Sequence, residues 1–187
     1  MKTTNNQFSN DTISLLKSLK GKNLDSISHE PFTGAPTSYG MVYLSIDKKK
    51  YVFKAYEEPM DYFGASEDIS KAKFELHKGP QKSSLVGVKF ITDAVNQKIM
   101  KITLVSTNET MKIKETGEEF AFLDTLGFIL ALENGHQLAL FKAGIFETIS
   151  IYQGCDPRNR IQKLANNYLG DFGSEAEGQS RIVYIDL

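Results

Sequence analysis

The chain has 187 residues, of which 41% are hydrophobic, and its formal net charge is -1. This length and apolar content predict a single domain over residues 1–187. The near-neutral charge and the presence of only three arginines argue against nucleic acid or an anionic membrane surface as partners.

Cys155 is the only cysteine of the chain. An intrachain disulfide is therefore excluded, and a reducing compartment is favoured. Residues 1–9 are predicted to be a polar tail, because they lack the apolar core of a signal peptide. No apolar run is long enough to cross a bilayer as a helix. We therefore expect a cytoplasmic protein.

The first half of the chain is predicted to contain one helix and several strands. Ser9, Asn10 and Asp11 can cap a short helix that ends at Gly21. Alternation of apolar and polar residues predicts strands at 24–27, 42–46, 51–55, 71–77, 86–90 and 99–105. The alternation stops between residues 57 and 68, so we interpret this segment as a loop with structure of its own.

The stretch Leu126–Lys142 contains two apolar runs separated by Asn134-Gly135. Asn-Gly is typical of a two-residue type I′ turn, whose twist matches that of paired strands. This turn predicts a hairpin in which Phe128 lies opposite Phe141. Both faces of the ribbon are apolar, which indicates a position in the middle of the folded body.

The C-terminal part is predicted to contain a strand, a helix and a final strand. The first strand is expected at 145–152. Asp156 and Pro157 are typical of a helix start and predict a helix that ends at Gly170. Residues 171–180 are rich in glycine and acids and are expected to form a flexible loop, before a strand at 181–186.

Strands dominate this pattern, and two helices flank them in no regular βαβ order. We therefore predict an α+β fold with a short N-terminal helix and one C-terminal helix. The sheet is expected to be mainly antiparallel and strongly curled or two-layered. Exposed strand edges would also permit a homodimer.

The residue types that usually carry catalysis are sparse. Cys155 precedes a predicted helix start, which favours a thiolate, but the adjacent Asp156 opposes one. The three histidines, His29, His77 and His136, show no metal-ligand spacing. We therefore assign no catalytic residue, no metal site and no cofactor, although enzymatic activity stays open.

The segment from Tyr56 to Asp68 combines carboxylates with aromatic side chains, a combination that suits recognition of a basic partner surface. The residues assigned to this partner-binding surface are Tyr56, Glu57, Glu58, Asp61, Tyr62, Phe63, Glu67 and Asp68. An acid/base pair, oxygen ligands for a hard cation, or a plain solvated loop anchored by its aromatics remain alternatives.

Arg158 and Arg160 lie near the predicted start of the C-terminal helix, where the helix dipole disfavours cations. A bound anion is one explanation for this pair, and the neighbouring Asp156 is another.

The sequence favours three functions. The first is a non-enzymatic cytoplasmic protein that binds another protein as an accessory, regulatory or toxin-neutralising factor. The second is a small-molecule binder with an apolar pocket among Phe53, Phe74, Phe90 and Phe128. The third is a small hydrolase-type enzyme that uses scattered carboxylates or Cys155.

Overall fold

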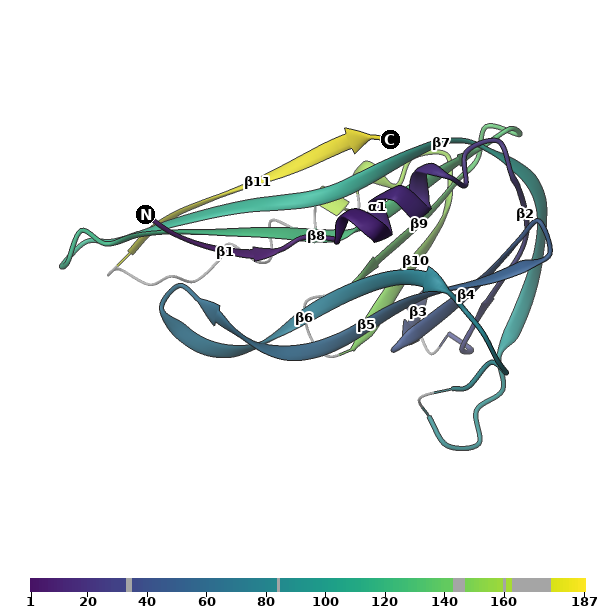
Figure 1. Cartoon of the computed structure of the whole chain (residues 1–187), viewed down its shortest axis with the longest axis horizontal. Helices are drawn as coiled ribbons and strands as arrows, with labels where there is room; N and C mark the ends of the chain where they lie inside the picture. The colour runs from purple at the N-terminus through teal and green to yellow at the C-terminus, as the bar shows by residue number, and fades with distance from the viewer. Residues whose placement is uncertain (33–34, 84, 143–146, 160, 163–175) are drawn as a thin grey trace.

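The computed structural model describes residues 1–32, 35–83, 85–142, 147–159, 161–162 and 176–187. About 65% of these residues are in strands and 7% are helical. The elements, shown in Figure 1, are β1 (Lys2–Asn6), α1 (Asn10–Lys17), β2 (Asn23–His29), β3 (Thr37–Tyr39), β4 (Met41–Ile46), β5 (Lys49–Tyr62), β6 (Ala65–Leu76), β7 (Ile91–Ile113), β8 (Glu119–Leu132), β9 (Gln137–Lys142), β10 (Thr148–Gly154) and β11 (Ala176–Asp186).

All described strands belong to one sheet, with the order β3-β10-β9-β8-β7-β2-β4-β5-β6. The long strand β7 connects its two parts, because residues 91–98 pair with β2 and residues 99–112 pair with β8. The strand β11 extends the sheet beside β7, and β1 lies parallel to residues 120–124 of β8. Every other pairing is antiparallel.

The predicted α+β class is wrong. The protein is mostly antiparallel β, and α1 is the one complete helix among the described residues. The sheet is open, with β3 and β6 at the ends of its path, and it is uncurled rather than strongly curled. Several strands were missed because their residues are polar on both faces of the sheet. Such a strand lacks the alternation of apolar and polar residues by which strands are recognised in a sequence.

Four further predictions differ from the structure or are described by it only in part. Within the predicted polar tail, residues 2–6 form β1, and residues 86–90 are not a strand. Of the predicted helix from Pro157 to Gly170, residues 158–159 and 161–162 are helical, and residues 160 and 163–170 lie outside the described part of the chain. In the predicted flexible loop at 171–180, residues 176–180 belong to β11 and the rest also lie outside it.

The N-terminal helix exists and begins where it was predicted, but it ends at Lys17 and not at Gly21, and it contributes to the main core. The hydroxyl of Ser9 accepts a hydrogen bond of 3.2 Å from the backbone N–H of Thr12 and caps α1. Leu16 and Leu19 are completely buried in a cluster with side chains of β2, β4–β9 and β10. Burial of each leucine contributes roughly 1.5–3 kcal/mol.

The predicted Asn-Gly hairpin exists as β8–β9, but its register is wrong by one residue. Phe128 lies opposite Leu140 and not opposite Phe141. The loop has three residues, because the N–H of Leu132 donates to the carbonyl of His136, and only Gly135 has a positive φ, of 82°. This geometry is the common three-residue alternative to a type I′ turn.

The segment predicted as a loop between residues 57 and 68 is instead the far end of the long β5–β6 hairpin. Strand pairing continues to Tyr62 and Ala65, and the turn is formed by Phe63 and Gly64 with φ of 55° and 90°. Two positive φ values are typical of a type I′ turn, but phenylalanine rarely adopts one. The sequence therefore lacks the usual signal for this turn.

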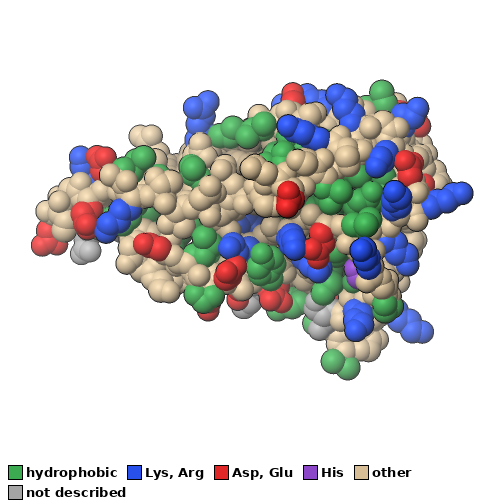
Figure 2. Space-filling model, in the orientation of Figure 1, with side chains coloured by type: hydrophobic (Ala, Val, Ile, Leu, Met, Phe, Trp, Pro, Cys, Tyr) green, Lys and Arg blue, Asp and Glu red, His purple; other side chains and the backbone are tan. Residues whose placement is uncertain are grey.

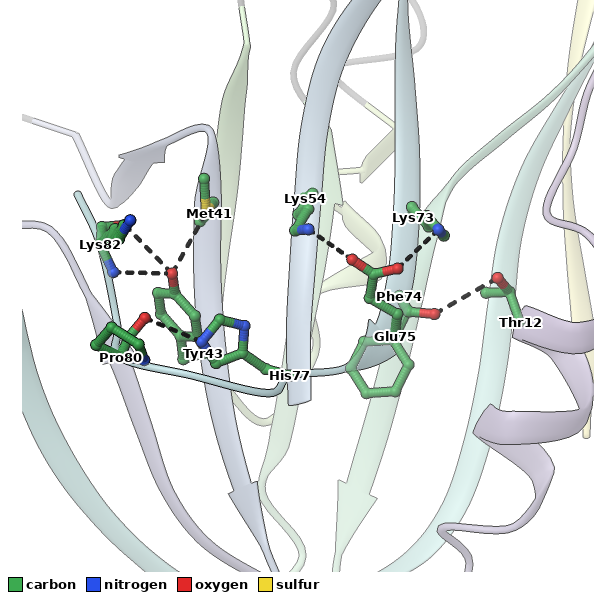
Figure 3. Close-up of polar contacts among 10 residues, drawn as sticks. All are labelled: Thr12, Met41, Tyr43, Lys54, Lys73, Phe74, Glu75, His77, Pro80 and Lys82. Carbon is green, nitrogen blue, oxygen red and sulfur yellow. Dashed lines mark hydrogen bonds and ion pairs between the residues drawn. The ribbon is translucent and has the colours of Figure 1, made fainter. Parts of the chain in front are cut away.

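The other end of β6 is tied to its neighbours by the side chains drawn in Figure 3. Glu75 lies between Lys54 and Lys73, with N–O distances of 2.5 and 2.7 Å, and these ammonium groups hold its pKa below the usual value. The hydroxyl of Tyr43 accepts a hydrogen bond of 3.1 Å from the backbone N–H of Lys82. These contacts fix both the last residues of β6 and the segment that follows.

No helix in the described part of the chain is both long and apolar enough to cross a membrane.

Candidate functional site

A pocket lies where β6 faces β7, β8 and β9, beside the end of the β5–β6 hairpin. Its cavity volume is about 90 Å³, room for several water molecules or a small polar group. The pocket is lined by residues of five strands, namely Tyr62, Asp68, Ile69, Ser70, Thr107, Glu109, Phe122, Asp124, Leu126 and Lys142. Four of these side chains are ionisable, three as carboxylates and one as an ammonium group, which is unusual for the inner side of a sheet.

A buried ion pair lies at the base of the pocket. The Nζ atom of Lys142 is 2.7 Å from Oδ1 of Asp124, and these residues are only 5% and 7% exposed. Lys142 also donates to the carbonyl of Ser70 on β6. The side chain of Asn6 donates to that same carbonyl and to Asp124, each at 3.0 Å.

These contacts connect strands that are not neighbours in the sheet. Ser70 belongs to β6 at one end of the strand order, whereas Asp124 and Lys142 belong to β8 and β9 near the other. Burial raises the pKa of the Asp124 carboxyl and lowers the pKa of the Lys142 amine, and the attraction between the two groups opposes both shifts. The pair and its bonds to Ser70 therefore connect β8 and β9 to the end strand β6, at a considerable desolvation cost.

Glu109 on β7 is a second buried carboxylate of the pocket, at 7% exposure. Its Oε2 atom accepts a hydrogen bond of 3.1 Å from the hydroxyl of Tyr62. Burial raises the pKa of Glu109, and the negative charge of Asp124 adds to this shift, whereas the hydrogen bond from Tyr62 and the ammonium of Lys142 oppose it. No lysine or arginine in the described ranges forms an ion pair with Glu109. Its charge is therefore incompletely compensated within the pocket.

Two buried hydroxyls of the pocket have no hydrogen-bond partner among the described residues. They are Oγ of Ser70 and Oγ1 of Thr107, in residues that are 7% and 3% exposed. An unsatisfied buried hydroxyl destabilises a protein by about 1–3 kcal/mol. Both residues line the pocket, so these hydroxyls are hydrogen-bonding groups of its wall that no described residue satisfies.

The aromatic end of the β5–β6 hairpin covers the outer side of the pocket. The ring of Tyr62 contacts that of Phe122 edge to face at 5.0 Å, and Phe63 contacts Phe120 at 6.4 Å. A shallow groove of about 400 Å³ continues outward along Phe63, Glu67 and Met111 and shares residues with the pocket. Figure 2 shows acidic and basic side chains interspersed over the visible face, without one large patch of either sign.

The structure brings part of the sequence-predicted surface to this site. Tyr62 and Asp68 line the pocket, and Phe63 and Glu67 line the groove. The remaining predicted residues lie along the hairpin outside both cavities. Of these, Glu58 pairs with Lys71 at 2.9 Å, Asp61 accepts from the N–H of Gly64 at 2.7 Å, Glu57 is exposed and Tyr56 is half-buried.

The other residues considered from the sequence do not converge on the pocket. Cys155 is an exposed free thiol, and Arg158 lies over the ring of Tyr184 at 4.9 Å. Arg160 lies outside the described residues. The histidines lie on separate elements: His29 is buried beside Asp93 at 3.0 Å, His77 follows β6, and His136 ends the β8–β9 loop. In the described ranges, no group of three or more histidine, cysteine, aspartate or glutamate residues could hold a metal ion.

Sequence reasoning missed Glu109, Asp124 and Lys142, although two of them had a detectable signal. Asp124 shares its strand parity with Phe122 and Phe128, and Lys142 shares its parity with Leu138. A charged residue on the apolar face of a central strand is rarely placed there by packing alone. Glu109 lies in a polar stretch and had no such signal.

Comparisons with protein families, curated proteins and solved structures find no match to this chain. A function can therefore be argued from the geometry of the pocket alone.

Proposed function

We propose that the protein works by binding a basic segment of another protein at the β5–β6 hairpin and the adjoining pocket. The observation that carries the proposal is the buried carboxylate of Glu109, which forms no ion pair in the described part of the chain, where the nearby Lys142 is paired with Asp124. A buried carboxylate without an ion pair is costly in the free protein, and a partner of opposite charge offsets that cost.

The charge and shape of the hairpin support the same partner. Exposed carboxylates at Glu57, Glu67 and Asp68 attract a basic segment, and the groove beside Phe63 offers apolar contact area. Binding requires no catalytic group, so the proposal is a non-enzymatic accessory, regulatory or neutralising role. We place this role in the cytoplasm because the chain carries a single exposed cysteine and no disulfide.

The alternative of an apolar ligand pocket has less support. Phe53 and Phe74 contact Phe128 at centroid distances of 5.4 and 5.2 Å, so the three rings fill the space between them. Phe90 packs instead against Tyr43 at 5.2 Å. An enzyme that uses Cys155 has less support as well, because this thiol is not among the residues that line the pocket.

The proposal is tested by calorimetric titration of short unstructured peptides, basic or acidic, at low and physiological salt. We expect basic peptides alone to bind, more weakly as salt rises. Reversal of charge in the double variant Glu57→Lys and Glu67→Lys should weaken binding about tenfold. The control Glu133→Lys makes the same kind of change at the β8–β9 loop and should leave affinity unchanged. If no basic peptide binds at low salt, the proposed function is wrong.

A further inference from the structure

The charges of the pocket determine the kind of ligand that it accepts. Lys142 forms its ion pair with Asp124 and also attracts Glu109 from a greater distance, but one ammonium balances only one of these two carboxylates. Glu109 and, at the rim, Asp68 then leave a surplus of negative charge. A ligand that enters the pocket is therefore stabilised if it carries a positive charge.

The hydrogen-bonding groups distinguish between the two cations of protein side chains. Glu109 uses Oε2 to accept from Tyr62, which leaves Oε1 as its free acceptor. A guanidinium prefers two parallel acceptors on one carboxylate, whereas an ammonium donates three separate hydrogen bonds. The unpartnered hydroxyls of Ser70 and Thr107 lie on different strands, and with Glu109 they offer separate acceptors to an ammonium.

The size and walls of the pocket suit the end of a lysine side chain. A volume of about 90 Å³ accommodates an ammonium with its neighbouring methylene groups, but not a large planar ligand. Tyr62 and Phe122 supply aromatic walls, and an ammonium beside an aromatic ring gains cation–π attraction. Ile69 and Leu126 supply apolar contacts for the methylene groups.

We propose that the pocket binds the ammonium group of a single lysine side chain of the partner protein, with Glu109 as its counter-charge and the hydroxyls of Ser70 and Thr107 as additional acceptors. This inference rests on the proposed function, because it names the group by which the basic segment is recognised. Acetylation of that lysine removes the charge, so it abolishes recognition.

The inference predicts a pH dependence of binding. Burial raises the pKa of the Glu109 carboxyl, and a bound ammonium favours its ionised form, so binding releases a proton over the range in which free Glu109 is protonated. Affinity therefore falls as the pH is lowered. The charged groups that face the same space are Asp68, Asp124 and Lys142, with Lys71 close enough to act on Lys142. A change of Glu109 alone isolates its part of the pH dependence.

The experiment compares peptides that are identical except at one central position, which carries lysine, Nε-acetyl-lysine or arginine. Affinities are measured by calorimetric titration for the full chain and for the variants Glu109→Gln and Thr107→Val. The matched control Glu115→Gln removes one exposed carboxylate outside the pocket. Circular dichroism establishes that each variant is folded before it is titrated.

We expect the lysine peptide to bind best, and acetylation or Glu109→Gln to weaken it at least about thirty-fold, as for the loss of a buried charge pair. Thr107→Val should weaken it several-fold, and Glu115→Gln should have no effect. Proton release on binding, measured in buffers of different ionisation enthalpy, should vanish in Glu109→Gln.

The result separates this inference from the proposed function. If basic peptides bind but acetylation or Glu109→Gln changes affinity less than about threefold, or arginine binds as tightly as lysine, the lysine pocket is wrong and the hairpin surface remains. If no basic peptide binds, both proposals fail.

Discussion

Replacement of Lys142 by methionine tests whether the ion pair beneath the pocket is buried and connects β8 and β9 to β6. Methionine keeps the length of the side chain but removes the ammonium that lies 2.7 Å from Asp124 and donates to Ser70. The carboxylate of Asp124 is then buried with Asn6 as its remaining side-chain donor. Removal of one partner from a buried pair costs about 3–5 kcal/mol, so we expect a loss of this size at neutral pH.

The loss is measured by urea unfolding at several pH values. Because burial raises the pKa of Asp124, its ionisation destabilises the variant as the pH rises above the ordinary value of 3.8, and the deficit should shrink toward pH 4. The double variant Lys142→Met with Asp124→Leu removes both charges and should recover most of the stability. If the single variant does not fold, recovery in the double variant still tests the reasoning. The control Lys73→Met breaks an exposed pair with Glu75 and should cost about 1 kcal/mol or less. A loss below about 1 kcal/mol for Lys142→Met would refute the buried-pair reasoning.

Three further predictions concern the stability of the free protein. Gly127→Ala places a Cβ atom 1.9 Å from a carbonyl oxygen of β9, whereas real Cβ atoms stay beyond 3.0 Å. The substitution should lower the free energy of unfolding by about 3 kcal/mol or more, measured by chemical unfolding. In the control Gly154→Ala the added Cβ meets open space, so the loss should be far smaller. Glu109→Gln should raise the melting temperature at neutral pH but not below pH 4.5, the ordinary pKa of a glutamate side chain. The pKa of Glu109 is raised in the folded state, so its ionisation opposes folding only above that pH. An equal gain in Glu115→Gln would contradict this reason. Thr107→Val removes an unpartnered hydroxyl at constant shape and should leave stability unchanged or increased, so a loss above about 1 kcal/mol would reveal a structural role for that hydroxyl.

Local patterns in the sequence correctly predicted several local conformations. Ser9 and its neighbours indicated the start of α1, and the apolar faces of residues 126–142 indicated a central hairpin. These predictions succeed because capping and alternation depend on residues a few positions apart. The same local reasoning failed at Phe63-Gly64, where a rare backbone conformation of phenylalanine makes the turn, and at Asn134-Gly135, where one additional loop residue shifts the register.

Only the tertiary structure decided that the protein has a pocket. Ser70, Glu109, Asp124 and Lys142 come from four strands, and their side chains meet because β6 faces β7, β8 and β9. The order of strands in a sheet depends on the sum of many cross-strand contacts between distant residues, and no single motif in the sequence encodes it. The sequence by itself determined that the chain forms an antiparallel sheet with an apolar centre and an acidic, aromatic segment. The fold then placed that segment over a buried carboxylate, because the β5–β6 hairpin extends beyond the core and covers the polar end of β7 and β8.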